Sequence, residues 1–148
     1  MRVETLADAA VRRTVTGRLG IVTGGRQTIN ITAPVESWLR EIGAGSGLVV
    51  AFVRHTTASL IIQENADPDV QADLLDALDA LAPSRAGYRH HDEGADDMPG
   101  HIKATLCPAS IAIPCNGRLL LGTWQSLYLV EHRSQGGPRE VILTYCGG

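Results

Sequence analysis

Residues 47–81 read GLVVAFVRHTTASLIIQENADPDVQADLLDALDAL and carry the clearest secondary-structure signals in the chain. Two apolar, β-branched runs, GLVVAFVRH and TTASLIIQE, predict buried strands with a bend near His55. The remainder predicts a helix after Asn65, with Asp67 as its N-cap and Pro68 at its first position. An apolar stripe at helical spacing supports that helix and consists of Val70, Leu74, Leu75, Leu78 and Leu81.

Shorter patterns on both sides of this segment complete the prediction. Thr32 is expected to cap a helix that ends near Ile42, and residues 98–106 are expected to form another short helix. Asn116-Gly117 and residues 134–137 have compositions typical of hairpin turns. Further strands are expected over residues 11–17, 27–32, 109–115, 118–132 and 138–146. The chain is thus predicted to be a single α+β domain over residues 1–148, with two or three helices packed on a largely antiparallel sheet.

Composition restricts the class of protein. The chain has 148 residues, 44% of them hydrophobic and 20% charged, which indicates one globular domain rather than a disordered chain. A net charge of −3 leaves no basic field for nucleic acid, and no apolar run approaches the roughly 18 residues of a membrane span. The N-terminus lacks the apolar core of a signal peptide. Three cysteines without CxxC spacing indicate a reducing, cytoplasmic location.

The string HHDEGADDMPGHIK at residues 90–103 is the strongest chemical signal. Seven of its first twelve residues are His, Asp or Glu, and imidazoles are common ligands of zinc and related metals. An acidic loop can also exist for solubility alone. Adjacent side chains diverge, so at most one of His90 and His91 is expected to enter a site. Lys103 closes the string and is the only lysine among 13 basic residues.

Two other polar strings flank apolar strand segments. The first runs from His55 through three hydroxyl residues to Gln63-Glu64-Asn65, and the same residue types are typical of ordinary strands and turns. In the second, Gly122-Thr123-Trp124-Gln125, the glycine indicates a bulge or a close ligand, and Trp124 is either a core residue or a flat wall for a heteroaromatic ring. His132 lies outside these strings and is expected to be exposed or capping.

Three segments together resemble the signature blocks of the YjbQ family. They are HTTASLIIQENADP, YRHHDEGADDMPGHIK, and GRLLLGTWQSLYLVEHR followed by GG, in that order. The resemblance extends from about residue 11 to 146. It implies a small α+β domain, assembly into a homotrimer, and the secondary thiamine-phosphate synthase activity attributed to the family. The characteristic histidines of the family pattern fall on His55, His90 and His101.

The resemblance implies an enzyme that joins a pyrimidine pyrophosphate to a thiazole phosphate and releases pyrophosphate. In that reaction His55, His90 and His101 are expected to hold a divalent metal, with zinc and magnesium both left open. Catalytic roles are expected for Glu64, Glu93 and Lys103, the last as a second positive charge. The remaining expected contacts to a phosphorylated ligand are Thr57, Ser59, Asn65, Asp97, Thr123, Trp124 and Gln125.

Two alternatives remain open on the sequence. One is a trimeric metal- or metabolite-binding protein that uses the same cleft and whose synthase activity is incidental. The other is a metal-dependent hydrolase, which only the His and carboxylate content supports. Each needs a polar, cation-bearing cleft, so residue content alone does not separate them.

Overall fold

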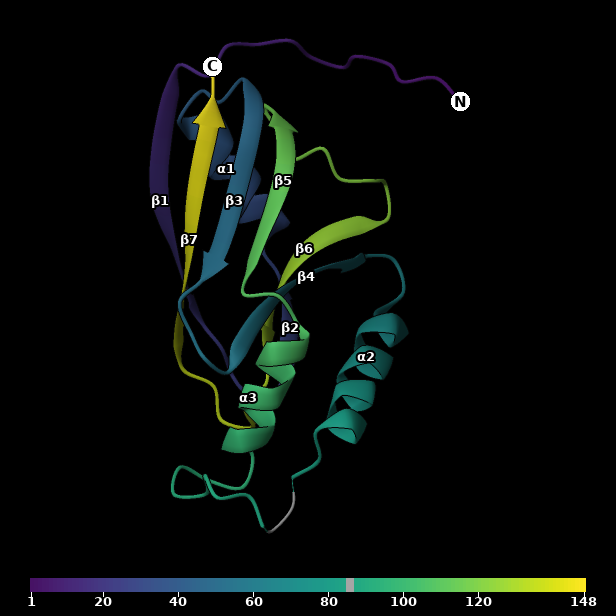
Figure 1. Cartoon of the computed structure of the whole chain (residues 1–148), viewed down its shortest axis with the longest axis vertical. Coiled ribbons are helices and arrows are strands. Elements are labelled where there is room, and N and C mark those ends of the chain that lie inside the picture. The colour runs from purple at the N-terminus through teal and green to yellow at the C-terminus, as the bar shows by residue number, and fades with distance from the viewer. Residues whose placement is uncertain (85–86) are drawn as a thin grey trace.

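The structure is a computed structural model that describes residues 1–84 and 87–148. Its elements, in chain order, are β1 (Arg13–Val22), β2 (Gln27–Asn30), α1 (Thr32–Glu41), β3 (Ser46–Val53), β4 (Ala58–Glu64), α2 (Pro68–Leu81), α3 (Asp97–Leu106), β5 (Ser110–Asn116), β6 (Gln125–Glu131) and β7 (Pro138–Gly147). The first residues and the C-terminus lie at one end of the molecule, and α2 and α3 lie toward the other (Figure 1).

The strands form two antiparallel sheets. The larger sheet has the order β1-β7-β3-β5, and the smaller one has the order β2-β6-β4. Every strand pair in both sheets is antiparallel. The predicted α+β, largely antiparallel single domain is therefore confirmed. The two strand signals of residues 47–81 separate at the bend near His55, because β3 belongs to the larger sheet and β4 to the smaller one.

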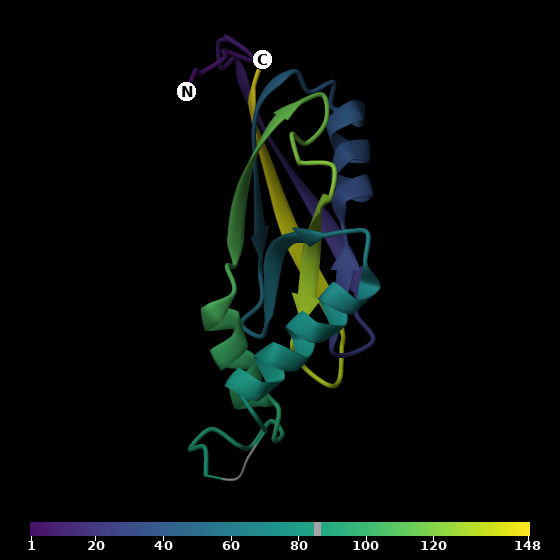
Figure 2. The same ribbon diagram turned by 90° about the vertical axis from the view of Figure 1, so that its right-hand side faces the viewer.

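One hydrophobic core joins the sheets and helix α1. Helix α1 covers one face of the larger sheet, as the turned view shows (Figure 2). It contributes the fully buried Val35 and Leu39, which lie in the i, i+4 relation that places two side chains on one helix face. The strands contribute alternate residues to the same core, among them Val49, Ala51, Val53, Leu60, Ile113, Leu127, Leu129, Val141, Leu143 and Tyr145.

The helices begin close to the predicted positions. Asp67 caps α2 by accepting a hydrogen bond from the Asp69 backbone N–H at 2.9 Å, and Pro68 starts the helix, as predicted. The prediction that Thr32 caps α1 is wrong. Thr32 is the first helical residue, and its hydroxyl accepts the Leu127 N–H at 2.9 Å, which ties the helix to β6. None of the described helices is long and apolar enough to cross a membrane.

The chain turns back at Asn116-Gly117, but not in the predicted two-residue hairpin, and the predicted hairpin at residues 134–137 is wrong. At Asn116-Gly117 only the glycine has a positive φ, of 67°, whereas a two-residue type I′ hairpin needs positive φ at both positions. Leu119 forms a single antiparallel bridge with Cys115, and the Leu120 N–H donates to the Pro114 carbonyl at 2.8 Å. Residues 118–124 form no longer strand, and carry the chain from β5 in the larger sheet to β6 in the smaller one. Residues 134–137 likewise connect β6 to β7 across the two sheets. Composition indicated both turns correctly, but the strands before and after each turn lie in different sheets.

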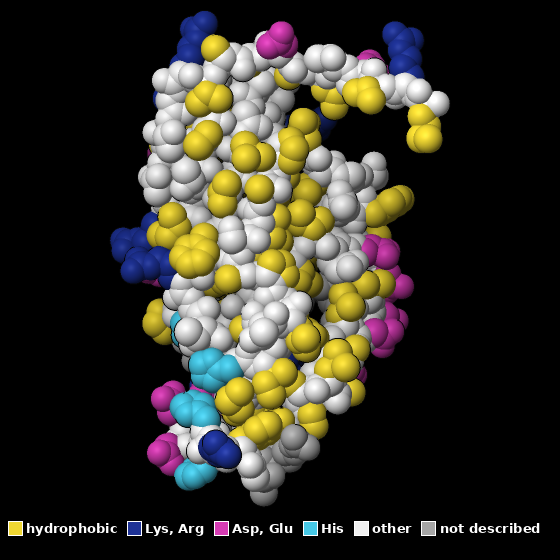
Figure 3. Space-filling view, viewed as in Figure 1, with side chains coloured by type: hydrophobic (Ala, Val, Ile, Leu, Met, Phe, Trp, Pro, Cys, Tyr) yellow, Lys and Arg dark blue, Asp and Glu magenta, His cyan; other side chains and the backbone are white. Residues whose placement is uncertain are grey.

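The face of the larger sheet opposite α1 has no helix over it. The strand register places alternate residues of β3 side by side with outward residues of β5 and β7: Leu48 beside Pro114 and Cys146, Val50 beside Ala112 and Thr144, Phe52 beside Ile142. Leu48 and Phe52 are exposed. Hydrophobic side chains gather on this face in the space-filling view (Figure 3). It is an open apolar surface in the single chain.

Candidate active site

Helix α3 approaches β4 closely because of Gly100. A Cβ added at this position would lie 3.1 Å from Cβ of Thr57 and 3.2 Å from Cδ of Arg133. Both separations are tighter than ordinary van der Waals contact, so a larger residue would push the helix away. Asp97 and His101 flank Gly100 at i, i+4 spacing and therefore lie on one face of the helix. The close approach brings this face to the end of the smaller sheet.

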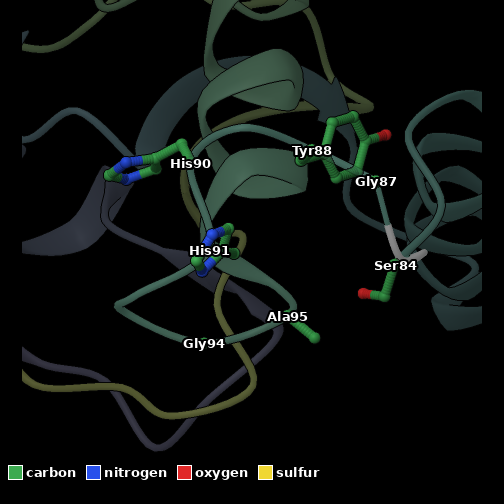
Figure 4. Close-up of a pocket in the computed structure, with 7 residues that line it drawn as sticks. All are labelled: Ser84, Gly87, Tyr88, His90, His91, Gly94 and Ala95. Carbon is green, nitrogen blue, oxygen red and sulfur yellow. The ribbon is translucent and has the colours of Figure 1, made fainter.

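Two histidines converge on the buried carboxylate of Asp97. Nε2 of His90 lies 2.5 Å and Nε2 of His101 lies 3.4 Å from Oδ2 of Asp97. The two imidazole rings stand edge to face, with centroids 5.5 Å apart. His91 does not join them, but lies exposed with Nδ1 2.9 Å from Asp92. The rings of His90 and His91 extend in different directions from adjacent backbone positions (Figure 4), as their stereochemistry predicts.

Arg133 holds this loop against the sheet. Its guanidinium pairs with Oδ1 of Asp97 and donates to the carbonyl of Glu93 at 2.7 Å. Asp96 accepts 2.7 Å hydrogen bonds from both the backbone and the hydroxyl of Ser134. Burial acts to raise the pKa of Asp96, but the Ser134 hydrogen bonds and Arg133 outweigh it and lower the pKa to about 2. The loop is thus anchored through charged, hydrogen-bonded contacts.

A cavity of about 540 Å³ opens beside these side chains. It is lined by His55, Thr56, Thr57, His90, Glu93, Asp97, His101, Arg133, Gln135, Gly136 and Arg139. The structure thereby brings six residues of the predicted site together: His55, Thr57, Glu93, His90, Asp97 and His101. The lining combines three imidazoles, two guanidiniums and two carboxylates, which suits a polar ligand.

Thr57 fixes the hydrogen position on His55. The backbone N–H of Thr57 donates to Nδ1 of His55 at 3.2 Å, so Nδ1 is an acceptor. A neutral imidazole with an accepting Nδ1 carries its hydrogen on Nε2. Burial, followed by the positive charge of Arg139, lowers the pKa of His55 and favours this neutral form. His55 therefore offers the cavity an N–H donor instead of a free lone pair for a metal.

His90, Asp97 and His101 form a donor set that fits a divalent metal. One ligand atom from each residue lies within 4.8 Å of the other two. Two imidazoles and one carboxylate are a common ligand set for zinc. Ligands of one tetrahedral zinc ion lie about 3.4 Å apart, whereas Nε2 of His90 lies 2.5 Å from Asp97. His90 would withdraw by about 1 Å to share an ion, a small side-chain adjustment on an exposed loop.

A buried carboxylate supports the arginine side of the cavity. Glu131, at the end of β6, is fully buried and accepts from Nε of Arg139 at 2.6 Å and from the Thr23 hydroxyl at 2.8 Å. Its other oxygen accepts the Arg133 backbone N–H at 3.0 Å. Sequence reasoning missed Glu131, Arg133 and Arg139. The only indication in the sequence was an acidic and a basic residue, Glu131 and Arg133, close together at the end of a strand. Arg139, which pairs with Glu131, lies on another strand.

Lys103 and His132 lie on the other side of α3. Lys103 is 5% exposed, and its ammonium pairs with Asp79 of α2. His132 is 3% exposed, which corrects the expectation of an exposed or capping residue, and its Nε2 lies 2.9 Å from the hydroxyl of Ser59. Both Lys103 and His132 line a separate cavity of about 380 Å³. The structure thus places the predicted residues Lys103 and Ser59 away from the histidine cavity.

The remaining predicted residues lie at the opposite end of the smaller sheet. The register pairs Glu64 with Gln125 at one end of β4 and β6, and Ala58 with Glu131 at the other. Six residue steps along a strand span about 20 Å. Glu64, Asn65, Thr123, Trp124 and Gln125 are therefore separated from the histidines within one chain.

Several of these distant side chains form hydrogen bonds with neighbouring residues of the same end of the sheet. The Asn65 amide donates to the carbonyls of Thr123 and Gln125 and to the Ser126 hydroxyl, at 3.2–3.4 Å. The side-chain oxygen of Gln125 accepts the Gly122 N–H at 2.8 Å. Asn65, Thr123 and Gln125 line a hollow of about 370 Å³. Trp124 is 65% exposed, so it is not a core residue.

Comparison with known proteins assigns the family. A family model described as "UPF0047 protein YjbQ-like" matches residues 18–148. The chain belongs to the YjbQ/UPF0047 family. It is 46% identical to the UPF0047 protein sll1880 of Synechocystis over 144 residues, which cover 96% of this chain and 98% of that protein. It is 48% identical to the UPF0047 protein YjbQ of Salmonella typhimurium over 103 residues, 69% of this chain and 75% of that protein.

Solved structures support the YjbQ-like fold. A hypothetical protein from Aeropyrum pernix superimposes with a TM-score of 0.81 at 34% identity, covering 90% of this chain and 99% of that one. An uncharacterised conserved protein of the YjbQ/UPF0047 family from Clostridium acetobutylicum gives a TM-score of 0.79 at 39% identity, with 86% and 98% covered. The two-sheet architecture is therefore shared with other members of the family.

Proposed function

We propose that this YjbQ-like protein is a small-molecule transferase of the secondary thiamine-phosphate synthase type. It would join a pyrimidine pyrophosphate to a thiazole phosphate and release pyrophosphate. The observation that carries this proposal is the 540 Å³ cavity, in which the His90–Asp97–His101 group lies beside two arginines and His55. A leaving pyrophosphate needs positive charge and hydrogen-bond donors of this kind.

The proposed step breaks one bond and forms one. The C–O bond between the exocyclic carbon of the pyrimidine and the pyrophosphate breaks, and the pyrophosphate leaves with the electron pair. A C–N bond forms from that carbon to the thiazole ring nitrogen, which becomes a thiazolium cation. The reaction requires no oxidant and no net proton transfer. The protein's task is to stabilise the departing charge and to hold the two substrates in contact.

Different residues of the cavity would stabilise the leaving pyrophosphate and the cationic product. A divalent ion, when held by His90, Asp97 and His101, would supply positive charge to the pyrophosphate oxygens. The Nε2–H of His55 would donate a hydrogen bond to the same oxygens, in the tautomer that Thr57 fixes. Glu93 also lines the cavity, where its carboxylate would face the thiazolium charge of the product.

A trimeric binding protein is the second candidate function, and one observation favours it. Trp124 and Gln125, expected to hold the pyrimidine ring, lie about 20 Å from the histidine cavity along β6. Within one chain, the described cavity lining contains imidazoles but no Phe, Tyr or Trp. A cavity that binds a phosphorylated metabolite without holding a second ring would make the protein a binding module.

We also propose that the protein assembles as a homotrimer. The open face of the larger sheet, with Leu48 and Phe52 exposed, is the apolar surface that such an assembly would cover. Light scattering should then return about three times the 15.8 kDa of one chain. Phe52→Asp should dissociate the assembly, whereas Leu81→Asp, which changes an exposed apolar residue of α2 away from this face, should not. The free cysteines Cys107, Cys115 and Cys146 support a reducing, cytoplasmic location.

The test of the transferase is a steady-state assay of the purified full-length protein. The pyrimidine pyrophosphate and the thiazole phosphate are supplied with no added metal, with Mg²⁺ or with Zn²⁺, and thiamine phosphate is quantified by mass spectrometry. Sustained turnover supports the transferase. Stoichiometric substrate binding without product would reject it in favour of the binding protein.

A further inference from the structure

The guanidinium of Arg139 lines the cavity and has N–H groups that no acceptor among the described residues engages. Arg139 is 9% exposed, and it lines the cavity with His55 and Arg133. Its Nε donates to Glu131 at 2.6 Å and its Nη1 donates to the Pro138 carbonyl at 3.0 Å. Among residues 1–84 and 87–148, Nη2 has no hydrogen-bond acceptor.

Glu131 gives this guanidinium a fixed orientation. The carboxylate is completely buried, and it is itself held by the Thr23 hydroxyl at 2.8 Å and the Arg133 backbone at 3.0 Å. Because hydrogen bonds hold both Nε and Nη1, the Arg139 side chain has little rotational freedom. Binding a ligand through the free edge of Arg139 would therefore cost little side-chain entropy.

Arg133 is not equivalent to Arg139. Its Nη1 pairs with Asp97 and its Nη2 donates to the Glu93 carbonyl at 2.7 Å, whereas its buried Nε lies 3.3 Å from Asp96 and has no hydrogen-bond partner among the described residues. These contacts are with the loop that carries His90, so they hold the site together. Of the two arginines in the cavity, Arg133 is paired with two loop carboxylates, whereas Arg139 is paired with one carboxylate and has an Nη2 without an acceptor among the described residues.

Lys103 is not available either. Its ammonium pairs with Asp79 and faces the separate 380 Å³ cavity. An anion in the histidine cavity would meet Arg139 and His55, and not the lysine. The planar guanidinium edge also matches the oxygens of a phosphoryl group in a way that a single ammonium does not.

We infer that Arg139, held by the buried Glu131, is the phosphoryl-binding residue of the histidine cavity, with the Nε2–H of His55 as a second donor. The ligand class is a phosphate ester or a diphosphate. This inference rests on the proposed function for the identity of the complete ligand. The anion contact itself requires only the geometry of Arg139, Glu131 and His55.

Calorimetric titration of the full-length protein with inorganic pyrophosphate tests the inference. Arg139→Lys should raise the Kd at least tenfold, because the ammonium would remain with Glu131 and leave no group for the anion. Arg54→Lys is the matched control, since Arg54 is exposed and paired with Glu140, and its Kd should stay within twofold of wild type. Lys103→Met should also stay within twofold. The same ranking is expected after dialysis against a chelator.

A second variant tests the inference independently, in case Arg139→Lys does not fold. The double change Glu131→Gln with Arg139→Gln removes both charges of the buried pair and should show the same loss of binding, with its folding checked by circular dichroism. Pyrophosphate binding by Arg139→Lys within twofold of wild type, or no binding by wild type, would overturn the inference. Arg139-dependent binding without formation of thiamine phosphate would support the anion site and reject the transferase.

Discussion

The two sides of helix α3 carry similar residue types in different roles. On one side Asp97 and His101 face an open cavity, together with His90 and Arg133. On the other side Lys103 pairs with Asp79 and lies near the buried His132. Each side has a carboxylate, a cation and an imidazole.

Access and hydrogen bonding distinguish the two sides. In the cavity, the carboxylate of Asp97 is buried while the histidines around it reach solvent. Behind α3, the imidazole of His132 is buried, and its Nδ1 has no hydrogen-bond partner among the described residues. A charged or polar group that a ligand can reach can act in binding, whereas one enclosed by the fold mainly affects stability. The following predictions test that division.

The largest effect is expected at Asp97. Asp97→Asn would remove the charge that Arg133, His90 and His101 share, so metal content and transferase activity should fall at least 100-fold. Breaking the buried contact with Arg133 should also cost about 3 kcal/mol of unfolding free energy. Elemental analysis, the product assay and chemical denaturation measure the three quantities. Asp92→Asn, on the exposed part of the same loop, is the control, and equal effects in both variants would contradict the prediction.

Acid should destabilise the protein through His132. Burial, followed by the charge of Lys103, lowers the pKa of His132 to about 4, against the opposing effects of Glu131 and Asp79. The unfolded chain takes up a proton below pH 6.5 and the folded protein only below about 4, so stability falls as pH falls through this range. The loss amounts to about 3 kcal/mol.

Denaturant unfolding between pH 7 and 4 measures this loss. His132→Gln should flatten the pH dependence, because the amide does not titrate in this range. His91→Gln, which changes an exposed histidine, should leave it as in wild type. If the unfolding free energy of His132→Gln depends on pH as steeply as that of wild type, another group causes the acid sensitivity.

Lys103→Met should lower stability more than it affects ligand binding. The methionine keeps the buried volume but removes the partner of Asp79, which is half-exposed and also contacts Arg26 at 2.9 Å. The expected loss is therefore about 1–2 kcal/mol, below that of a fully buried pair. Denaturation and pyrophosphate titration are compared in the same variant. If Lys103→Met instead binds pyrophosphate weakly and keeps its stability, Lys103 acts on the ligand, as expected from the sequence.

The smallest effect is expected at Trp124. Trp124→Leu changes an exposed side chain, so unfolding free energy should shift by less than about 0.5 kcal/mol. Pyrophosphate affinity should be unchanged, since about 20 Å of β6 separates this loop from Glu131 and Arg139. A tenfold loss of affinity would show that the loop reaches the cavity of a neighbouring chain in the assembly.

Local signals in the sequence explain which predictions succeeded. The leucine stripe, Asp67 and Pro68 determine α2 through contacts within a few residues, and the bend near His55 follows from polar residues between two apolar runs. The string at residues 90–103 contains His90, Asp97 and His101, which the structure brings together. The strands expected to pair across the two turns lie in different sheets, because turn composition does not specify the partner of a strand.

The sequence by itself determined the identity of most strands and helices, the family, and the polar strings that carry chemistry. Only the tertiary structure decided which strings meet. The length of β6 separates Trp124 from Glu131, and the 3.6-residue period of α3 directs His101 and Lys103 into different cavities. Arg139 joins the site because β7 begins beside the end of β6. Such juxtapositions depend on contacts between elements distant in sequence, which residue patterns along one chain do not encode.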